Sequence, residues 1–249
     1  MRAPAALVLI ALAGCGPGEG AAPEAATVKT KAAAGSVIRA KELLAAERLA
    51  EAAAEYRAVL VQDPKNVGAL EGLSRIASRM NDAPSALGFI SRAAELKPDD
   101  VSIVNQLGVA LVSNGRKKDA AQAFDRALAL NPRDPFACLN AAQNQADLGD
   151  WDRARRHAEA AAELLPADAT PWLLLGRFQM RQGKFVEAVA PLREAAKRAP
   201  DQALVQYYLG KALTAAGRRA EAEEPLRAAL RGNPPDDVRK EVEALLAGK

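Results

Sequence analysis

Residues 101–134 read VSIVNQLGVALVSNGRKKDAAQAFDRALALNPRD, and this stretch decides the fold. Near its end, Pro132 belongs to a set of prolines that recur every 34 residues: Pro64, Pro98, Pro132, Pro166, Pro200 and Pro234. A fixed period of this length is typical of repeat proteins. The period divides the chain into six units, at 33–66, 67–100, 101–134, 135–168, 169–202 and 203–236.

Other positions of the unit keep the same step. The twentieth position is always alanine: Ala52, Ala86, Ala120, Ala154, Ala188 and Ala222. The eighth position is always small: Ala40, Ser74, Gly108, Ala142, Gly176 and Gly210. Small residues in these columns allow two helices to approach closely, because little side chain separates the backbones.

Each unit also carries the signals of a helix, a tight turn and a second helix. The mid-unit turn is marked by Asn81, Gly115, Gly149, Gly183 and Gly217, residues that tolerate the left-handed conformation of a helix end. The recurring proline stops the second helix. The last position of each unit is polar, and five of its six residues are good N-caps for the following helix: Asn66, Asp100, Asp134, Asp168, Gln202 and Asp236.

This pattern resembles the tetratricopeptide repeat, a 34-residue helix–turn–helix unit. The fifth unit carries the family's residues most fully, with Trp172, Leu175, Gly176, Ala188, Leu192 and Pro200. The resemblance implies an all-α, right-handed superhelical solenoid of six repeats over 33–236. Residues 237–249 are expected to form a C-terminal capping helix, since an end repeat needs a cover for its apolar face.

Some residues depart from the family pattern. Glu47 stands where a turn glycine is usual, and Pro191 and Pro225 fall inside predicted second helices, where each removes a backbone hydrogen bond. Unit four has small or polar residues at positions that are normally large and apolar: Cys138, Ala141, Gln145 and Ala158. Trp151 is the residue expected to fill the resulting gap.

The N-terminal segment has the features of a targeting signal. Arg2 precedes an apolar run over 5–13, which is too short to span a bilayer as a helix. The run ends in Leu12-Ala13-Gly14-Cys15, which resembles the lipobox of bacterial lipoproteins. The resemblance implies that residues 1–14 are a signal peptide and that Cys15 carries diacylglyceryl and palmitate-type acyl chains. A plain secretory signal with an incidental cysteine is the alternative.

Residues 15–32 are rich in Gly, Ala and Pro. With Cys15 lipidated, they are expected to form a flexible tether between the membrane and the repeats. No Asp follows the cysteine, so the lipoprotein sorting machinery is expected to deliver the protein to the outer membrane, facing the periplasm. With Cys15 lipidated, Cys138 has no partner for a disulfide and is expected to be a buried small hydrophobe.

The family resemblance puts the first helix of each unit on the concave side of the solenoid, where a partner would bind. The second, fifth, ninth, twelfth and thirteenth positions of the units are expected to line this groove, since most share one helix face. The candidate residues are Val37, Lys41, Leu44, Glu71, Arg75, Arg79, Asn105, Phe136, Leu139, Gln143, Leu173, Arg177, Met180, Arg181, Tyr207 and Lys211.

This set mixes apolar side chains with cations near both ends, which favours a peptide that has apolar side chains and some acidic groups. The alternative is that the cations only solvate the groove and that the apolar residues pack between units. No fifth position is lysine, which argues against the terminal-carboxylate clamp of chaperone-binding members of the family.

Composition argues against several other functions. A net charge of +3 and only 4% aromatic residues do not indicate nucleic-acid binding. One histidine and two cysteines argue against a His/Cys metal site. His157 has no nucleophile motif around it. We therefore expect no enzymatic activity, no cofactor apart from the covalent lipid, and no small-molecule substrate.

A lipobox, a short tether and six units together resemble the pilotin lipoproteins of type IV pilus systems, which help the secretin subunit reach the outer membrane and assemble. The resemblance implies a secretin subunit as the partner. Two other functions fit the same architecture: a periplasmic scaffold that docks peptidoglycan enzymes, and a subunit of the outer-membrane protein insertion machine.

Overall fold

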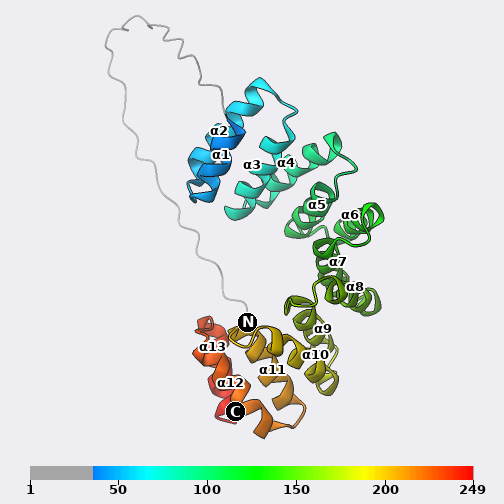
Figure 1. Cartoon of the computed structure of the whole chain (residues 1–249), viewed down its shortest axis with the longest axis vertical. Coiled ribbons are helices and arrows are strands. Elements are labelled where there is room, and N and C mark those ends of the chain that lie inside the picture. The colour runs from blue at the N-terminus through cyan, green and yellow to red at the C-terminus, as the bar shows by residue number, and fades with distance from the viewer. Residues whose placement is uncertain (1–35, 249) are drawn as a thin grey trace, which may run out of the picture. The chain divides into compact units, whose positions relative to one another are not determined.

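The computed structural model describes residues 36–248, and these residues form thirteen α-helices and no strand (Figure 1). The predicted signal peptide, Cys15 and the tether lie outside the described residues. The helices are α1 (Val37–Ala45), α2 (Leu49–Gln62), α3 (Val67–Arg79), α4 (Ala83–Leu96), α5 (Val101–Ser113), α6 (Lys117–Leu130), α7 (Pro135–Leu148), α8 (Trp151–Leu164), α9 (Thr170–Arg181), α10 (Phe185–Arg198), α11 (Ala203–Ala215), α12 (Arg219–Arg231) and α13 (Asp236–Leu246).

The predicted solenoid of helix pairs is confirmed. Each odd-numbered helix packs against the even-numbered helix that follows it, and each even-numbered helix packs against the first helix of the next pair. The substantial contacts that skip one helix all join odd-numbered helices: α1–α3, α5–α7, α7–α9, α9–α11 and α11–α13. The odd-numbered helices therefore lie on the inner, concave side of the stack, as Figure 1 shows for the described residues.

The mid-unit turns have the predicted conformation. Gly115, Gly149, Gly183 and Gly217 have φ values of 75° to 86°, and Asn81 occupies the same turn with a φ of 57°. In the first unit Glu47 adopts a φ of 59° at this position, so the turn is kept without glycine. A left-handed residue here ends the first helix and reverses the chain into the second.

The helix N-termini confirm three of the predicted caps. The side chains of Asn66, Asp100 and Asp134 accept hydrogen bonds from the backbone N–H three residues ahead, at 2.7 to 3.1 Å. The prediction was wrong for Asp168, because Ala169 is the N-cap of α9 and Asp168 instead accepts from the N–H of Thr170, two residues ahead. The prediction was wrong for Asp236, which is the first residue of α13 because Pro235 occupies the N-cap position.

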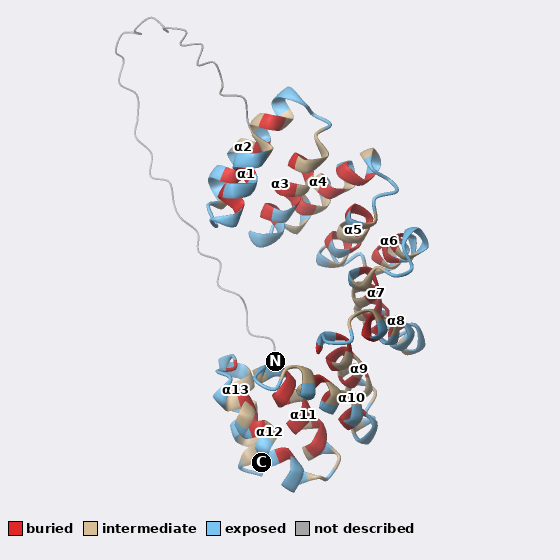
Figure 2. Ribbon diagram, viewed as in Figure 1, coloured by how far each residue is buried: buried red, intermediate tan, exposed pale blue. Residues whose placement is uncertain are grey.

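The core of the described residues is a series of six clusters of buried side chains along the stack, and Figure 2 shows buried residues in every pair. The alanines of the twentieth column are at most 1% exposed. The small eighth column serves close packing, since Gly108 lies directly against the ring of Phe124 and Gly210 against Leu226. These contacts bring the two helices of a unit together.

In unit four, Trp151 helps to fill the space left by the small residues, as predicted. Ala141 and Ala158 are buried. Trp151 packs over the same region, and its ring centroid lies 6.5 Å from that of Phe178 on the following unit. Two aromatic rings from neighbouring units therefore supply the volume that the alanines leave out.

The last helix, α13, covers the final pair. Val242 is fully buried within the cluster formed by α11 and α12, and Val238 and Leu245 pack against that cluster. The predicted capping helix is thus present. Within residues 36–248, every helix is too short or too polar to cross a membrane.

Candidate protein-binding groove

The predicted site residues all lie on α1, α3, α5, α7, α9 and α11, and we call the surface of these six helices the groove face. The structure sorts the predicted residues by exposure. Lys41, Arg75, Arg79, Phe136 and Arg181 are exposed, and Leu44, Leu173 and Tyr207 are buried. The half-buried ones are Val37, Glu71, Asn105, Leu139, Gln143, Arg177, Met180 and Lys211.

The middle of the groove face exposes large apolar side chains. Phe136 is 64% exposed and Val109, from the neighbouring α5, is 44% exposed. A cavity of about 130 Å³ between α5 and α7 is lined by Val109, Phe124 and Asn144, among others. Buried Asn144 lends it a polar element, because Asn144 Oδ1 has no hydrogen-bond partner within residues 36–248. Exposed apolar surface beside a free buried acceptor is suited to binding a polypeptide segment.

Five of the predicted residues meet in one cavity at the N-terminal end of the groove face. This cavity has a volume of about 590 Å³ and is open between α1, α2 and α3. Its lining includes Lys41, Leu44, Glu71, Arg75 and Arg79. Arg79 donates to Glu47 Oε1 at 2.6 Å, and Glu71 accepts from Gln106 Nε2 at 3.3 Å. Lys41 and Arg75 form no ion pair with any residue that the structure describes.

At the C-terminal end, by contrast, the cations are held by neighbouring helices. Arg181 Nη1 lies 2.8 Å from Asp147 Oδ1, and its guanidinium stacks over the ring of Trp151. Lys211 Nζ lies 2.6 Å from Glu241 Oε1 on α13. The positive charge at this end is therefore largely neutralised within the fold.

Tyr207 joins the Lys211–Glu241 pair. Its hydroxyl donates to Glu241 Oε2 at 2.6 Å and accepts from Lys211 Nζ at 3.0 Å. Burial, together with the hydrogen bond to Glu241, raises the pKa of Tyr207. The hydrogen bonds from Lys211 and Tyr207 lower the pKa of Glu241. This network ties the capping helix α13 to α11.

The network predicts a pH-dependent contribution to stability. Because the pKa of Glu241 is lowered by folding, its contribution is present above the ordinary value of 4.5 and is lost as the pH falls through the lowered value. The side chain is 42% exposed, so solvent screening limits the effect to less than about 1 kcal/mol. We expect Glu241→Gln to lower the Tm at neutral pH and to differ little from the wild type in acid.

The matched control is Glu243→Gln on the same helix, since Glu243 is exposed. Thermal unfolding of both variants and the wild type, followed by circular dichroism across this pH range, measures the difference. A Glu241→Gln deficit that persists unchanged in acid, or an equal deficit in Glu243→Gln, would contradict the assignment.

The surroundings of Cys138 and His157 do not activate either side chain for catalysis. Cys138 is buried as predicted, and burial raises the pKa of its thiol, which disfavours the nucleophilic thiolate. Burial also lowers the pKa of His157. Among the described residues, no three His, Cys, Asp or Glu side chains are grouped so as to hold a metal ion.

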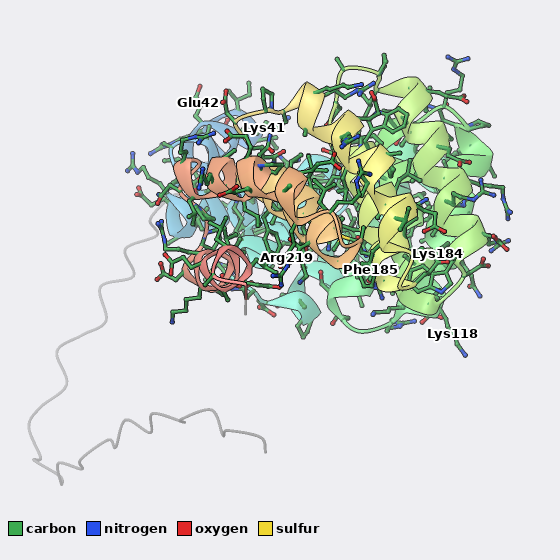
Figure 3. All side chains as sticks on the ribbon, turned by 90° about the horizontal axis from the view of Figure 1, so that it is seen from below. Lys41, Glu42, Lys118, Lys184, Phe185 and Arg219 are labelled. Atoms are coloured by element: carbon green, nitrogen blue, oxygen red, sulfur yellow. The ribbon has the colours of Figure 1, made fainter. Side chains whose placement is uncertain are left out.

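Other basic residues lie away from the groove face, on the edge where second helices begin. Figure 3 labels Lys118, Lys184 and Arg219 on this edge, at the starts of α6, α10 and α12, while Lys41 lies on α1. Several cations of this edge pair with acids of their own helix, as Arg116 does with Asp119 at 2.7 Å. Lys118 is exposed to solvent, whereas Lys184 and Arg219 each line a smaller cavity, of about 240 and 250 Å³.

The structure also shows features that were not predicted from the sequence. Gly68 and Gly72 line the N-terminal cavity, and the ring of Tyr56 forms part of its floor. The sequence does carry a signal for these two glycines. Of the six units, only unit two has glycine at both its second and its sixth position. Val109 belongs to the ninth column, which was expected to line the groove, and it adds to the apolar middle predicted from Phe136 and Leu139.

Comparisons with known proteins match the repeats described above. Models of the tetratricopeptide repeat match residues 43–108, 102–134, 139–203 and 179–237. DnaJ homolog subfamily C member 3 of Rattus norvegicus is 34% identical over 92 residues, which are 37% of this chain and 18% of that protein. A TPR repeat-containing protein of Treponema pallidum is 30% identical over 129 residues, which are 51% of this chain and 16% of that protein. The chain thus spans less than a fifth of either relative.

Several solved structures share the fold over most of their length. PilW, a widely conserved type IV pilus biogenesis factor, superposes with a TM-score of 0.75 at 23% identity, covering 83% of this chain and 96% of PilW. PilF of Pseudomonas aeruginosa gives a TM-score of 0.69 at 16% identity, with coverages of 84% and 95%. YrrB, a TPR protein with an unusual peptide-binding site, gives 0.56 at 19% identity, with coverages of 76% and 97%. The repeat models cover more than half of this chain, and the chain belongs to the tetratricopeptide-repeat family.

Proposed function

We propose that this protein is an outer-membrane lipoprotein that binds a segment of a type IV pilus secretin subunit on its groove face and promotes the targeting and assembly of the secretin. The observation that carries the proposal is the apolar middle of the groove face, where Phe136 and Val109 stay exposed and the cationic residues lie on α3 and α9 to either side. Apolar surface of this kind, rimmed by charge, usually marks an interface with another protein.

Two further observations support the pilus assignment. The fold extends over nearly the whole of PilW and PilF, at 96% and 95% of those chains. The sequence around Cys15 resembles a lipobox, which would attach the repeats to a membrane.

The mechanism proposed depends on local concentration. Two or more acyl chains on Cys15 would hold the protein stably at the membrane, which one chain alone would not do. The groove face would bind the secretin segment, and the lipid would then confine the bound subunit to the membrane surface. Confinement raises the effective concentration of subunits and favours ring assembly without any further contact.

Affinity capture tests the partner. The full chain, purified from detergent-solubilised membranes of its own cells, is expected to co-purify with a secretin subunit identified by mass spectrometry. Recovery of peptidoglycan hydrolases or synthases instead would support the scaffold function, and recovery of the barrel insertion machine would support the third alternative. Either result without secretin would contradict the proposal.

Two sets of variants separate anchoring from binding. Cys15→Ser is expected to move the protein from the membrane to the soluble fraction, because it removes the attachment point for lipid. Val109→Ser combined with Phe136→Ser is expected to reduce secretin capture about tenfold or more, since exposed apolar anchors are lost from the interface. The control is Val186→Ser on α10, which is 65% exposed and lies off the groove face.

Leu173 is unsuitable for such a test. It is 7% exposed, so a glutamate in its place would unfold the repeat rather than probe binding. Membrane retention of Cys15→Ser, or equal capture by the double serine variant with an unchanged helical circular dichroism signal, would refute the corresponding part of the proposal.

A further inference from the structure

Two glycines are among the residues that line the cavity at the N-terminal end of the groove face. Gly68 and Gly72 are one helical turn apart on α3 and line the cavity together. A Cβ at Gly68 would make ordinary van der Waals contact with Asn66 Oδ1 and Val37 Cγ1, both at 3.6 Å, so a side chain is accommodated there. At Gly72 the ring of Tyr56, which is 1% exposed, lies directly against the backbone. The cavity therefore has an apolar floor and a wall without side chains.

The charge in this cavity is positive. Its lining holds three cations, Lys41, Arg75 and Arg79, against a single carboxylate, Glu71. Arg79 already pairs with Glu47, which is not part of the lining, but Lys41 and Arg75 have no acidic partner among residues 36–248. Because neither cation is already paired, an anionic group in this cavity could form charge-assisted hydrogen bonds to both without displacing a carboxylate of the protein.

The C-terminal end of the groove face has no comparable pair of free cations among the described residues. Arg181 is paired with Asp147, and Lys211 with Glu241. Arg177 forms no ion pair among the described residues, but its guanidinium stacks on the ring of Tyr208, 5.2 Å from the centroid. Positive charge that is free to meet a ligand is thus concentrated at the α1–α3 end, and the apolar middle begins at Val109 and Phe136.

From this asymmetry we infer that the α1–α3 cavity receives an acidic group of the bound polypeptide, and that apolar side chains of the same segment reach Val109 and Phe136. The inference rests on the proposed function and adds the chemistry and the direction of the ligand. The segment lies with its acidic part at the α1–α3 end of the groove face and its apolar part at α5–α7.

A selection of displayed peptides tests the chemistry. Random dodecapeptides are selected against the full chain in detergent micelles, and the strongest binders are synthesised with a fluorescein label. We expect the selected peptides to contain aspartate or glutamate next to a group of apolar residues. Replacing the acidic residues by asparagine or glutamine is expected to weaken binding, measured by fluorescence anisotropy, by about tenfold or more.

Protein variants locate the acidic group. Lys41→Gln combined with Arg75→Gln is expected to cause the same loss, and to leave the asparagine and glutamine peptides unaffected. Lys118→Gln combined with Lys184→Gln is the matched control, because these exposed lysines lie on the opposite edge in Figure 3. Gly68→Leu adds an apolar side chain to the lining without changing the charge of the cavity, and it too is expected to weaken binding of the acidic peptides.

The direction is tested with a nitroxide spin label at the acidic end of a selected peptide. We expect NMR signals of α1–α3 to broaden and those of α9–α11 to persist. Selection of peptides without acidic residues, equal binding by the Lys41/Arg75 variant, or broadening at α9–α11 would overturn the inference.

Two controls keep the outcomes distinct. Binding of the Cys15→Ser full chain to phosphatidylglycerol vesicles that depends on Lys41 and Arg75 would assign the cavity to a lipid headgroup, and would overturn a peptide ligand. Failure of secretin capture with intact acidic-peptide binding would refute the proposed function alone. Normal secretin capture by the Lys41/Arg75 variant would refute the inference alone.

Discussion

Replacing Phe124 with alanine is expected to lower the free energy of unfolding by about 3–5 kcal/mol. Phe124 is 1% exposed and packs against the backbone of Gly108, where no other side chain can take its place. The substitution removes most of a buried ring and leaves a cavity at the contact between α5 and α6. Urea unfolding followed by circular dichroism at the helical bands measures the change.

Phe136→Ala is the matched control for this experiment. The two residues are chemically identical, but Phe136 is 64% exposed, so its loss is expected to change stability by no more than about 0.5 kcal/mol. The same variant should impair partner capture. Similar stability losses in both variants would show that Phe124 is not the packing residue described above.

The second large effect is expected at Gly210 on α11. A Cβ at this position would lie 2.5 Å from Cγ and Cδ2 of Leu226 and 3.3 Å from its backbone nitrogen. Gly210→Val therefore forces α11 and α12 apart, and we expect it to destabilise the protein by about 1–3 kcal/mol, the usual cost of overpacking a core. Valine has only a small advantage over glycine in helix propensity, so it offsets little of this cost.

Adding a side chain at Gly88 on α4 is expected to have the opposite effect on stability. A Cβ there would meet nothing within 4 Å. Gly88→Ala is expected to stabilise the protein by about 0.5–1 kcal/mol, because alanine favours a helix more than glycine does. Thermal or urea unfolding of both variants decides the point: a neutral Gly210→Val or a destabilising Gly88→Ala would contradict the packing.

The fold could be predicted because the residues that decide it act locally or by repetition. Pro132 ends a helix by its own covalent geometry, and Gly115 turns the chain because it tolerates a positive φ. Gly108 and Gly210 recur at the unit period, which predicted their close packing. Asp236 was assigned wrongly because the last unit is followed by a cap whose first helical turn begins directly after Pro235.

The site could be predicted only in part, because exposure and pairing depend on neighbouring units. Leu139 and Leu173 share a column, but Leu173 is buried in a cluster with Tyr207 and Met180, whereas Leu139 stays half-buried. Lys211 is neutralised by Glu241, 30 residues further along the chain. No local rule gives these distances, since they depend on the rotation between one unit and the next.

The contacts of each helix pair reach only the pairs before and after it. An additional 34-residue unit inserted into such a stack would disturb one seam and leave every other seam as it is. The length of surface offered to a partner can therefore change over evolution in whole steps, by duplication or loss of a unit, while the ends keep their own specialised chemistry.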